Sequence, residues 1–185
     1  MLITKEELRQ LRDYCNRPDE DDVRYKQIIK QKLIEDNKII YLLDDKELED
    51  AEAEAEEYLG ISILPMFIIP GTQTSVRNYL CYETSFDYVS RENSIIKYQQ
   101  IIFYCLCHKD DIVVKEVSVA RHDLMAAVLT DKFNGCNDFG TQMKLVSNKP
   151  SIVDNNYACR TLIFENYTTN SITRNGKLTG LRIGT

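Results

Sequence analysis

The sequence of 185 residues contains no run of 18 or more apolar residues, so we expect no membrane-spanning helix and no membrane partner. Its N-terminus, Met1–Glu7, has neither the basic start nor the long apolar core of a secretory signal peptide. We therefore expect the protein to be made and kept in a reducing cytosol.

Cysteine is present, but not in a pattern that indicates disulfides. The six cysteines are scattered through predicted helices and strands, whereas disulfide frameworks belong to small, loop-rich secreted domains. We predict six free thiols. The composition is that of an ordinary globular protein, with 43% hydrophobic and 28% charged residues. A chain of this length can bury one core and a small satellite subdomain.

Negative charge is concentrated in the first third of the chain. Residues 1–60 hold 10 Lys/Arg against 18 Asp/Glu, whereas residues 61–185 hold 13 against 11. Proteins that read nucleic-acid sequences gain most of their affinity by neutralising phosphates. The acidic balance therefore argues against direct, sequence-specific DNA binding.

The N-terminal third reads as helical. Thr4 and Glu7 form a capping box, and the helix that follows ends at Pro18. A second helix begins in the acidic run Asp19–Asp22 and carries an apolar stripe to about Asp36. Ile39–Leu43 is expected to be a short helical turn.

Residues Lys46–Leu59 predict one further helix that faces solvent. Seven of the eleven residues Glu47–Glu57 are acidic, with alanines between them, and Gly60 is a plausible C-cap. The alternation of Ala and Glu could also suggest a metal site, but a solvated helix is the better reading. We predict a helical subdomain over residues 1–60, an α+β core over 61–167 and an extended C-terminal arm over 168–185.

The core is predicted as an antiparallel or mixed sheet of four to five strands with one packed helix. Pro65 makes Ile61–Ile69 an extended connection or an edge strand. Strands follow at Tyr79–Phe86 and Ile95–His108, and the second is apolar on both faces over Ile101–Cys107, which places it centrally or against another subunit. The remaining predicted elements are a helix over 120–133 and two strands, 142–147 and 157–167, joined by a nine-residue loop. The fold class is α+β, preceded by N-terminal helices.

The cluster Cys105, Cys107 and His108 invites a chemical reading. On a strand the two thiols face one side and the imidazole the other, and no Cys-x2–4-Cys knuckle is present for zinc. A thiol nucleophile needs a nearby base, and His122 is the alternative partner. No Gly-rich phosphate loop, nucleophile elbow or carboxylate pair accompanies these residues. We expect packing, with no metal and no cofactor.

Arg121 and Asp123 stand at the start of the predicted core helix, where Asp123 suits the helix dipole. Arg121 could pair internally with Glu83 or Glu116, or reach across a subunit boundary. Both readings stay open.

The last segment, Thr168–Thr185, has no acid, three bases and three glycines, with only isolated apolar residues. Such a segment cannot form a core of its own. We expect an arm that orders on a neighbouring chain.

With this layout, the chain from about Tyr25 to Tyr167 resembles a family of neck proteins from tailed bacteriophages, the tail terminators and head–tail connectors. The residues that carry the resemblance are Ile28–Leu33, Ile68–Thr74, Tyr79–Glu83, the strand ending Cys107-His108, and the helix opening Ala120–Leu124.

The resemblance implies a non-enzymatic virion protein, assembled in the host cytoplasm into a ring of six or twelve subunits at the head–tail junction. Its partners would be adjacent neck, portal or tail-tube proteins, with DNA passing through the lumen. The candidate subunit interface comprises Ile101, Phe103, Arg121, Asp123, Leu178, Leu181 and Ile183. An acidic helix facing the lumen would repel phosphate through Glu47, Glu49, Glu52, Glu54 and Glu56.

Two other functions remain as alternatives. One is a small cytosolic enzyme that uses Cys107 or His122. The other is a phage or plasmid regulator that acts through protein contacts.

Overall fold

A computed structural model describes residues 4–14, 21–68, 76–89 and 96–169. The fold is α+β, as predicted. Its strands are β1 (Ile63–Leu64), β2 (Tyr79–Val89), β3 (Ile96–His108), β6 (Lys144–Ile152) and β7 (Tyr157–Thr169). They form one mixed sheet in the order β1-β2-β3-β7-β6, in which β1 pairs with β2 in parallel and the other pairs are antiparallel. The central position predicted for β3 is confirmed.

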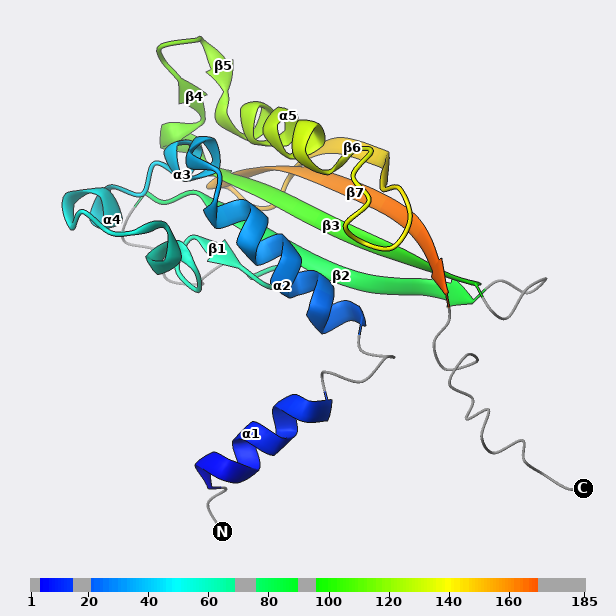
Figure 1. Cartoon of the computed structure of the whole chain (residues 1–185). Coiled ribbons are helices and arrows are strands. Elements are labelled where there is room, and N and C mark those ends of the chain that lie inside the picture. The colour runs from blue at the N-terminus through cyan, green and yellow to red at the C-terminus, as the bar shows by residue number, and fades with distance from the viewer. Residues whose placement is uncertain (1–3, 15–20, 69–75, 90–95, 170–185) are drawn as a thin grey trace, which may run out of the picture.

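The helices of the main body lie on one face of the sheet (Figure 1). They are α2 (Asp21–Ile34), α3 (Asn37–Leu43), α4 (Lys46–Asp50) and α5 (Arg121–Phe133), with short 3-10 turns η1 (Ala55–Tyr58) and η2 (Lys109–Asp111). A two-strand hairpin, β4 (Val113–Val114) and β5 (Val119–Ala120), precedes α5 and was not predicted.

At the N-terminus, α1 (Lys5–Tyr14) begins with the predicted capping box. The Thr4 hydroxyl accepts from the Glu7 N–H at 3.2 Å, while the Glu7 carboxylate accepts from the Thr4 N–H at 2.7 Å. This contact satisfies backbone donors that the helix itself leaves unpaired.

The main core lies between the sheet and the helices that cover it. Phe103 on β3 is fully buried, and its ring lies 4.8 Å from Phe133 of α5 and 5.9 Å from Phe164 of β7. Tyr25 of α2 meets Phe139 edge-to-face at 5.1 Å. Such aromatic pairs each contribute about 0.5–1.5 kcal/mol beyond the burial of their surface. The core therefore spans the predicted subdomain boundary at residue 60, and that division stays a prediction.

The opposite face of the sheet carries a smaller cluster of Tyr79, Cys81, Leu106, Tyr157 and Cys159. The chain after β1 crosses this face, where the ring of Phe67 packs on Tyr104 with centroids 4.6 Å apart. The alternation that places Cys105 and Cys107 in the main core and His108 on the opposite face is confirmed.

The prediction of one continuous helix over Lys46–Leu59 is wrong. Helix α4 ends at Asp50, and Glu52 adopts a left-handed conformation with φ of 53°. The Ala53 N–H bonds to the Leu48 carbonyl at 3.0 Å, and the Glu52 N–H to the Glu49 carbonyl at 3.0 Å, which together form a Schellman ending. The chain turns back because Leu48 and Tyr58 are both buried in the core.

The predicted nine-residue loop between the last two strands is also wrong. Strand β6 continues through Pro150 to Ile152, and only residues 153–156 connect it to β7. Because β6 is an edge strand, the N–H that Pro150 lacks does not interrupt the sheet.

Candidate functional site

Arg121, the first residue of α5, joins three elements at one end of the sheet. The residue is 5% exposed. The guanidinium donates to Asp44 Oδ2 at 2.8 Å, to Asp111 Oδ1 at 2.7 Å, and to the carbonyls of Asp111 and Leu42 at 3.1 and 3.3 Å. A planar guanidinium with several donors suits such a set of acceptors. Arg121 therefore fixes α3 and η2 to α5.

The partners predicted for Arg121, Glu83 and Glu116, are wrong. Glu83 lies on the opposite face of the sheet, where it accepts from the Phe67 N–H at 3.0 Å. Glu116 is exposed between β4 and β5. Asp44 follows α3 and Asp111 closes η2, and sequence reasoning assigned neither of them to Arg121.

Asn78 extends this network into the sheet. Its buried amide donates to the Leu43 carbonyl at 3.0 Å and to Asp111 Oδ2 at 2.7 Å, and its oxygen accepts from the His108 N–H at 3.1 Å. Next to it, Arg77 pairs with the buried Asp45 at 2.9 Å. These contacts hold the corner between α3 and α4 in place against the ends of β2 and β3.

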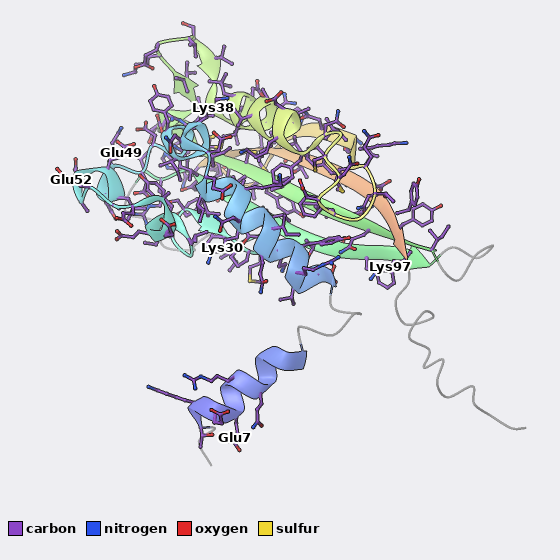
Figure 2. The ribbon with its side chains drawn as sticks, viewed as in Figure 1. Glu7, Lys30, Lys38, Glu49, Glu52 and Lys97 are labelled. Atoms are coloured by element: carbon purple, nitrogen blue, oxygen red, sulfur yellow. The ribbon has the colours of Figure 1, made fainter. Side chains whose placement is uncertain are left out.

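Two adjoining hollows lie on this fixed corner. The first, which we call the α3–α5 groove, has a volume of about 420 Å³ and an almost wholly apolar wall, lined by Asn37, Lys38, Tyr41, Leu42, Leu124, Ala127 and Val128. Tyr41 is 59% exposed although it is a large aromatic residue. Figure 2 places Lys38 on α3 beside α5.

Tyr41 also borders the second hollow, which we call the polar cavity. It has a volume of about 590 Å³ and is lined further by Asp44, Lys46, Glu49, Asp111, Val113, Val114, Lys115, Glu116 and Arg121. Lys46 pairs with Asp44, and with Glu49 at 3.2 Å. Glu116 has no ion-pair partner within the described ranges. The apolar α3–α5 groove and the charged polar cavity thus adjoin at Tyr41.

Beyond the polar cavity, the segment from α4 to η1 presents an acidic surface, which we define as the seven acids of residues 47–57. All seven are exposed. Figure 2 shows Glu49 and Glu52 projecting from this end of the molecule. The candidate lumen residues Glu47, Glu49, Glu52, Glu54 and Glu56 all belong to this surface. Whether the surface faces a lumen stays a prediction.

The match to known proteins covers this end of the molecule. Residues 36–166 match the family model described as YomW. The chain belongs to the YomW family. No curated protein matches it. The family name is associated with a Bacillus phage and indicates a phage-related protein, without specifying a neck or tail-terminator role.

The part of the chain that matches the YomW model begins at Asp36, the N-cap of α3, and ends within β7. It therefore includes the α3–α5 groove, the polar cavity, the acidic surface and the Arg121 network, and it omits α1 and α2. The features described at this end of the sheet all lie within the family match.

The candidate interface residues of this YomW family member are not all brought together. Ile101 and Phe103 are fully buried under α2 and α5, so the prediction that they face another subunit is wrong. Asp123 instead pairs with Arg160 of β7 at 2.5 Å. Leu178, Leu181 and Ile183 lie outside the described residues. Sequence reasoning missed Tyr41, whose signal was a large aromatic residue on a short helix.

Cys105 and Cys107, the two thiols of the cluster considered as a chemical site, are fully buried. Burial raises the pKa of Cys107 well above its usual range, and the nearby Arg121 acts in the opposite direction. A thiol nucleophile needs the reverse, a lowered pKa and access to solvent. Burial also lowers the pKa of His122, and its Nδ1 has no hydrogen-bond partner among the described residues.

Among residues 4–14, 21–68, 76–89 and 96–169, no three His, Cys, Asp or Glu side chains are grouped so that they could hold a metal ion. None of the helices in those ranges has the length and apolar character that crossing a bilayer requires.

Proposed function

We propose that this YomW family member is a non-enzymatic structural protein of a tailed-phage virion. It assembles in the host cytoplasm into a ring of six or twelve subunits at the head–tail junction, as a tail terminator or head–tail connector. Its neighbours are portal, neck or tail-tube proteins, and DNA passes through its lumen without specific contact.

The acidic surface carries this proposal. Seven exposed carboxylates lie within eleven residues, on a segment anchored by the buried side chains of Leu48 and Tyr58. DNA carries one negative charge per about 1.7 Å of helix axis, so a rim of fixed carboxylates repels it and lets it slide. The phage-related family supports the same function, and so does the corner between α3 and α4 that buried contacts hold in place beside this surface.

The direct test is to find the protein in particles. Phage purified from a host that carries this gene should contain the chain, detected by mass spectrometry at a constant ratio to the portal protein. The purified full chain should have a mass several times 21.5 kDa by light scattering. A chain that is monomeric at high concentration and absent from purified particles would contradict the proposal.

A charge-reversal pair tests the lumen directly. Phage with Glu52→Lys/Glu56→Lys should assemble in normal numbers yet deliver DNA about tenfold less efficiently, because the new cations bind phosphate. The matched control is Glu35→Lys/Asp131→Lys, two exposed acids outside the acidic surface, with the same change in charge. Equal effects from both pairs would show that the acidic surface does not face DNA.

A further inference from the structure

We propose that the α3–α5 groove binds the segment 170–185 of a neighbouring copy of this chain. The contact would link copies in a head-to-tail arrangement. This inference rests on the self-assembly part of the proposed function, and it names the surface and the segment that make the contact.

The α3–α5 groove has an apolar wall and adjoins the charged lining of the polar cavity. Leu124 and Val128 on α5 are half-buried, Ala127 between them is exposed, and Tyr41 of α3 forms the opposite wall. Through Tyr41 the groove opens into the polar cavity, where Glu116 is exposed and has no ion-pair partner among the described residues. A matching ligand has apolar anchors followed or interrupted by a base.

The segment 170–185 has this chemistry. It holds four apolar residues and three bases but no acid, namely Ile172, Leu178, Leu181, Ile183, Arg174, Lys177 and Arg182. Leucines three apart can enter an apolar groove, and Arg182 between Leu181 and Ile183 can reach a carboxylate at its end. The net charge of the segment is opposite to that of the neighbouring acidic surface.

The place where the described chain ends favours a neighbouring copy. Asp123, in the first turn of α5, contacts Arg160 of β7, so the groove lies over the first half of that strand. Thr169 lies nine residues further along, about 30 Å away at 3.3 Å per residue. In Figure 1 the chain leaves β7 at the end of the sheet opposite to α3 and α4.

Returning to the groove of the same copy requires an extended chain between Thr169 and the first leucine of the segment. Leu178 is nine residues past Thr169 and reaches back about 30 Å only when the chain is fully extended. When a neighbouring copy places its α3–α5 groove beside the end of β7, the segment reaches that groove without being fully extended. Contact between two different surfaces repeats from copy to copy, and it closes into a ring when the rotation permits.

Complementary full-length variants test this contact. The segment variant is Leu178→Asp/Leu181→Asp, and the groove variant is Tyr41→Ala/Ala127→Arg, which changes two exposed side chains. The control, Asp131→Arg, adds a cation one turn further along α5 outside the groove lining. Thermal unfolding of each variant checks that the fold is kept, and light scattering measures the mass.

We expect the wild type and the control to assemble and the two variants to be monomeric when alone. An equal mixture of the two should give dimers and nothing larger, because only one intact groove meets one intact segment. A mixture that stays monomeric, or a groove variant that assembles like wild type, would overturn the inference.

A peptide separates this inference from the proposed function. A peptide of residues 168–185 should bind the segment variant, and should bind the groove variant at least about tenfold more weakly. No binding to the segment variant, with the chain still present in virions, would refute the contact alone. Binding, with the chain absent from virions, would refute the virion role alone.

Discussion

Replacing Arg121 with methionine tests whether one buried cation holds this end of the molecule together. The change keeps a long apolar side chain but removes donors to two carboxylates and two carbonyls. Breaking a buried ion pair from one side costs about 3–5 kcal/mol, because the partner charge stays behind.

Two observations reduce that figure. The side chains of Asp44 and Asp111 are 20% and 24% exposed, so water reaches them in part. Asp44 also keeps Lys46 as a partner, and Asp111 keeps the amide of Asn78. We therefore expect Arg121→Met to lower the free energy of unfolding by about 2–4 kcal/mol, a large share of the usual total of about 5–15 kcal/mol.

Urea unfolding followed by circular dichroism measures this loss. Arg121→Lys should lose less, because an ammonium keeps the charge but cannot reach all four acceptors. The control is Arg9→Met, whose side chain is 80% exposed and which should change stability by less than about 0.5 kcal/mol. The variant with Asp44→Asn, Asp111→Asn and Arg121→Met should lose less than the sum of its parts. A loss below about 1 kcal/mol for Arg121→Met would refute the reasoning.

Three further predictions concern backbone strain, thiols and pH. Glu52→Gly should stabilise the protein by about 0.5–1 kcal/mol in the same assay, since glycine accepts a positive φ, whereas Glu56→Gly within η1 should not. Iodoacetamide should label Cys136, which is part-exposed, well before the buried Cys107, and fast labelling of Cys107 in peptide maps would support an active thiol instead. Burial lowers the pKa of His122 in the folded protein, so as the pH drops the imidazole is protonated in the unfolded chain before it is protonated in the folded one. The free energy of unfolding should therefore fall as the pH drops below about 6.5. The free energy of unfolding of His122→Gln should fall less steeply over the same pH range.

The elements that the sequence predicted correctly are those with strong local signals. The capping box at Thr4, the stripe of α2 and the two-faced apolar run of β3 each follow from neighbouring residues. The prediction from Pro65 that its segment lies at most at the edge of the sheet is confirmed, because β1 is an edge strand. These features depend on spacing along the chain, which a single sequence displays.

The features that the sequence could not predict depend on distant contacts. Ala and Glu favour a helix throughout residues 46–59, yet burial of Leu48 and Tyr58 forces a turn between them. Asp44 lies 77 residues from Arg121, so nothing near Arg121 in the sequence points to it. The α3–α5 groove likewise arises where two helices meet. Pro150 favours a loop when only its neighbours are considered, and it is the edge position of β6 in the sheet that allows a proline within the strand.

The position of β3 has a consequence for the synthesis of this protein. β3 pairs with β2, which precedes it, and with β7, which is the last described strand. Sheets that depend on such distant pairing fold slowly, and an unpaired apolar strand edge invites aggregation. We therefore expect co-translational folding to finish only after β7 has left the ribosome. A chain that stalls before Tyr157 should collect in inclusion bodies or be degraded.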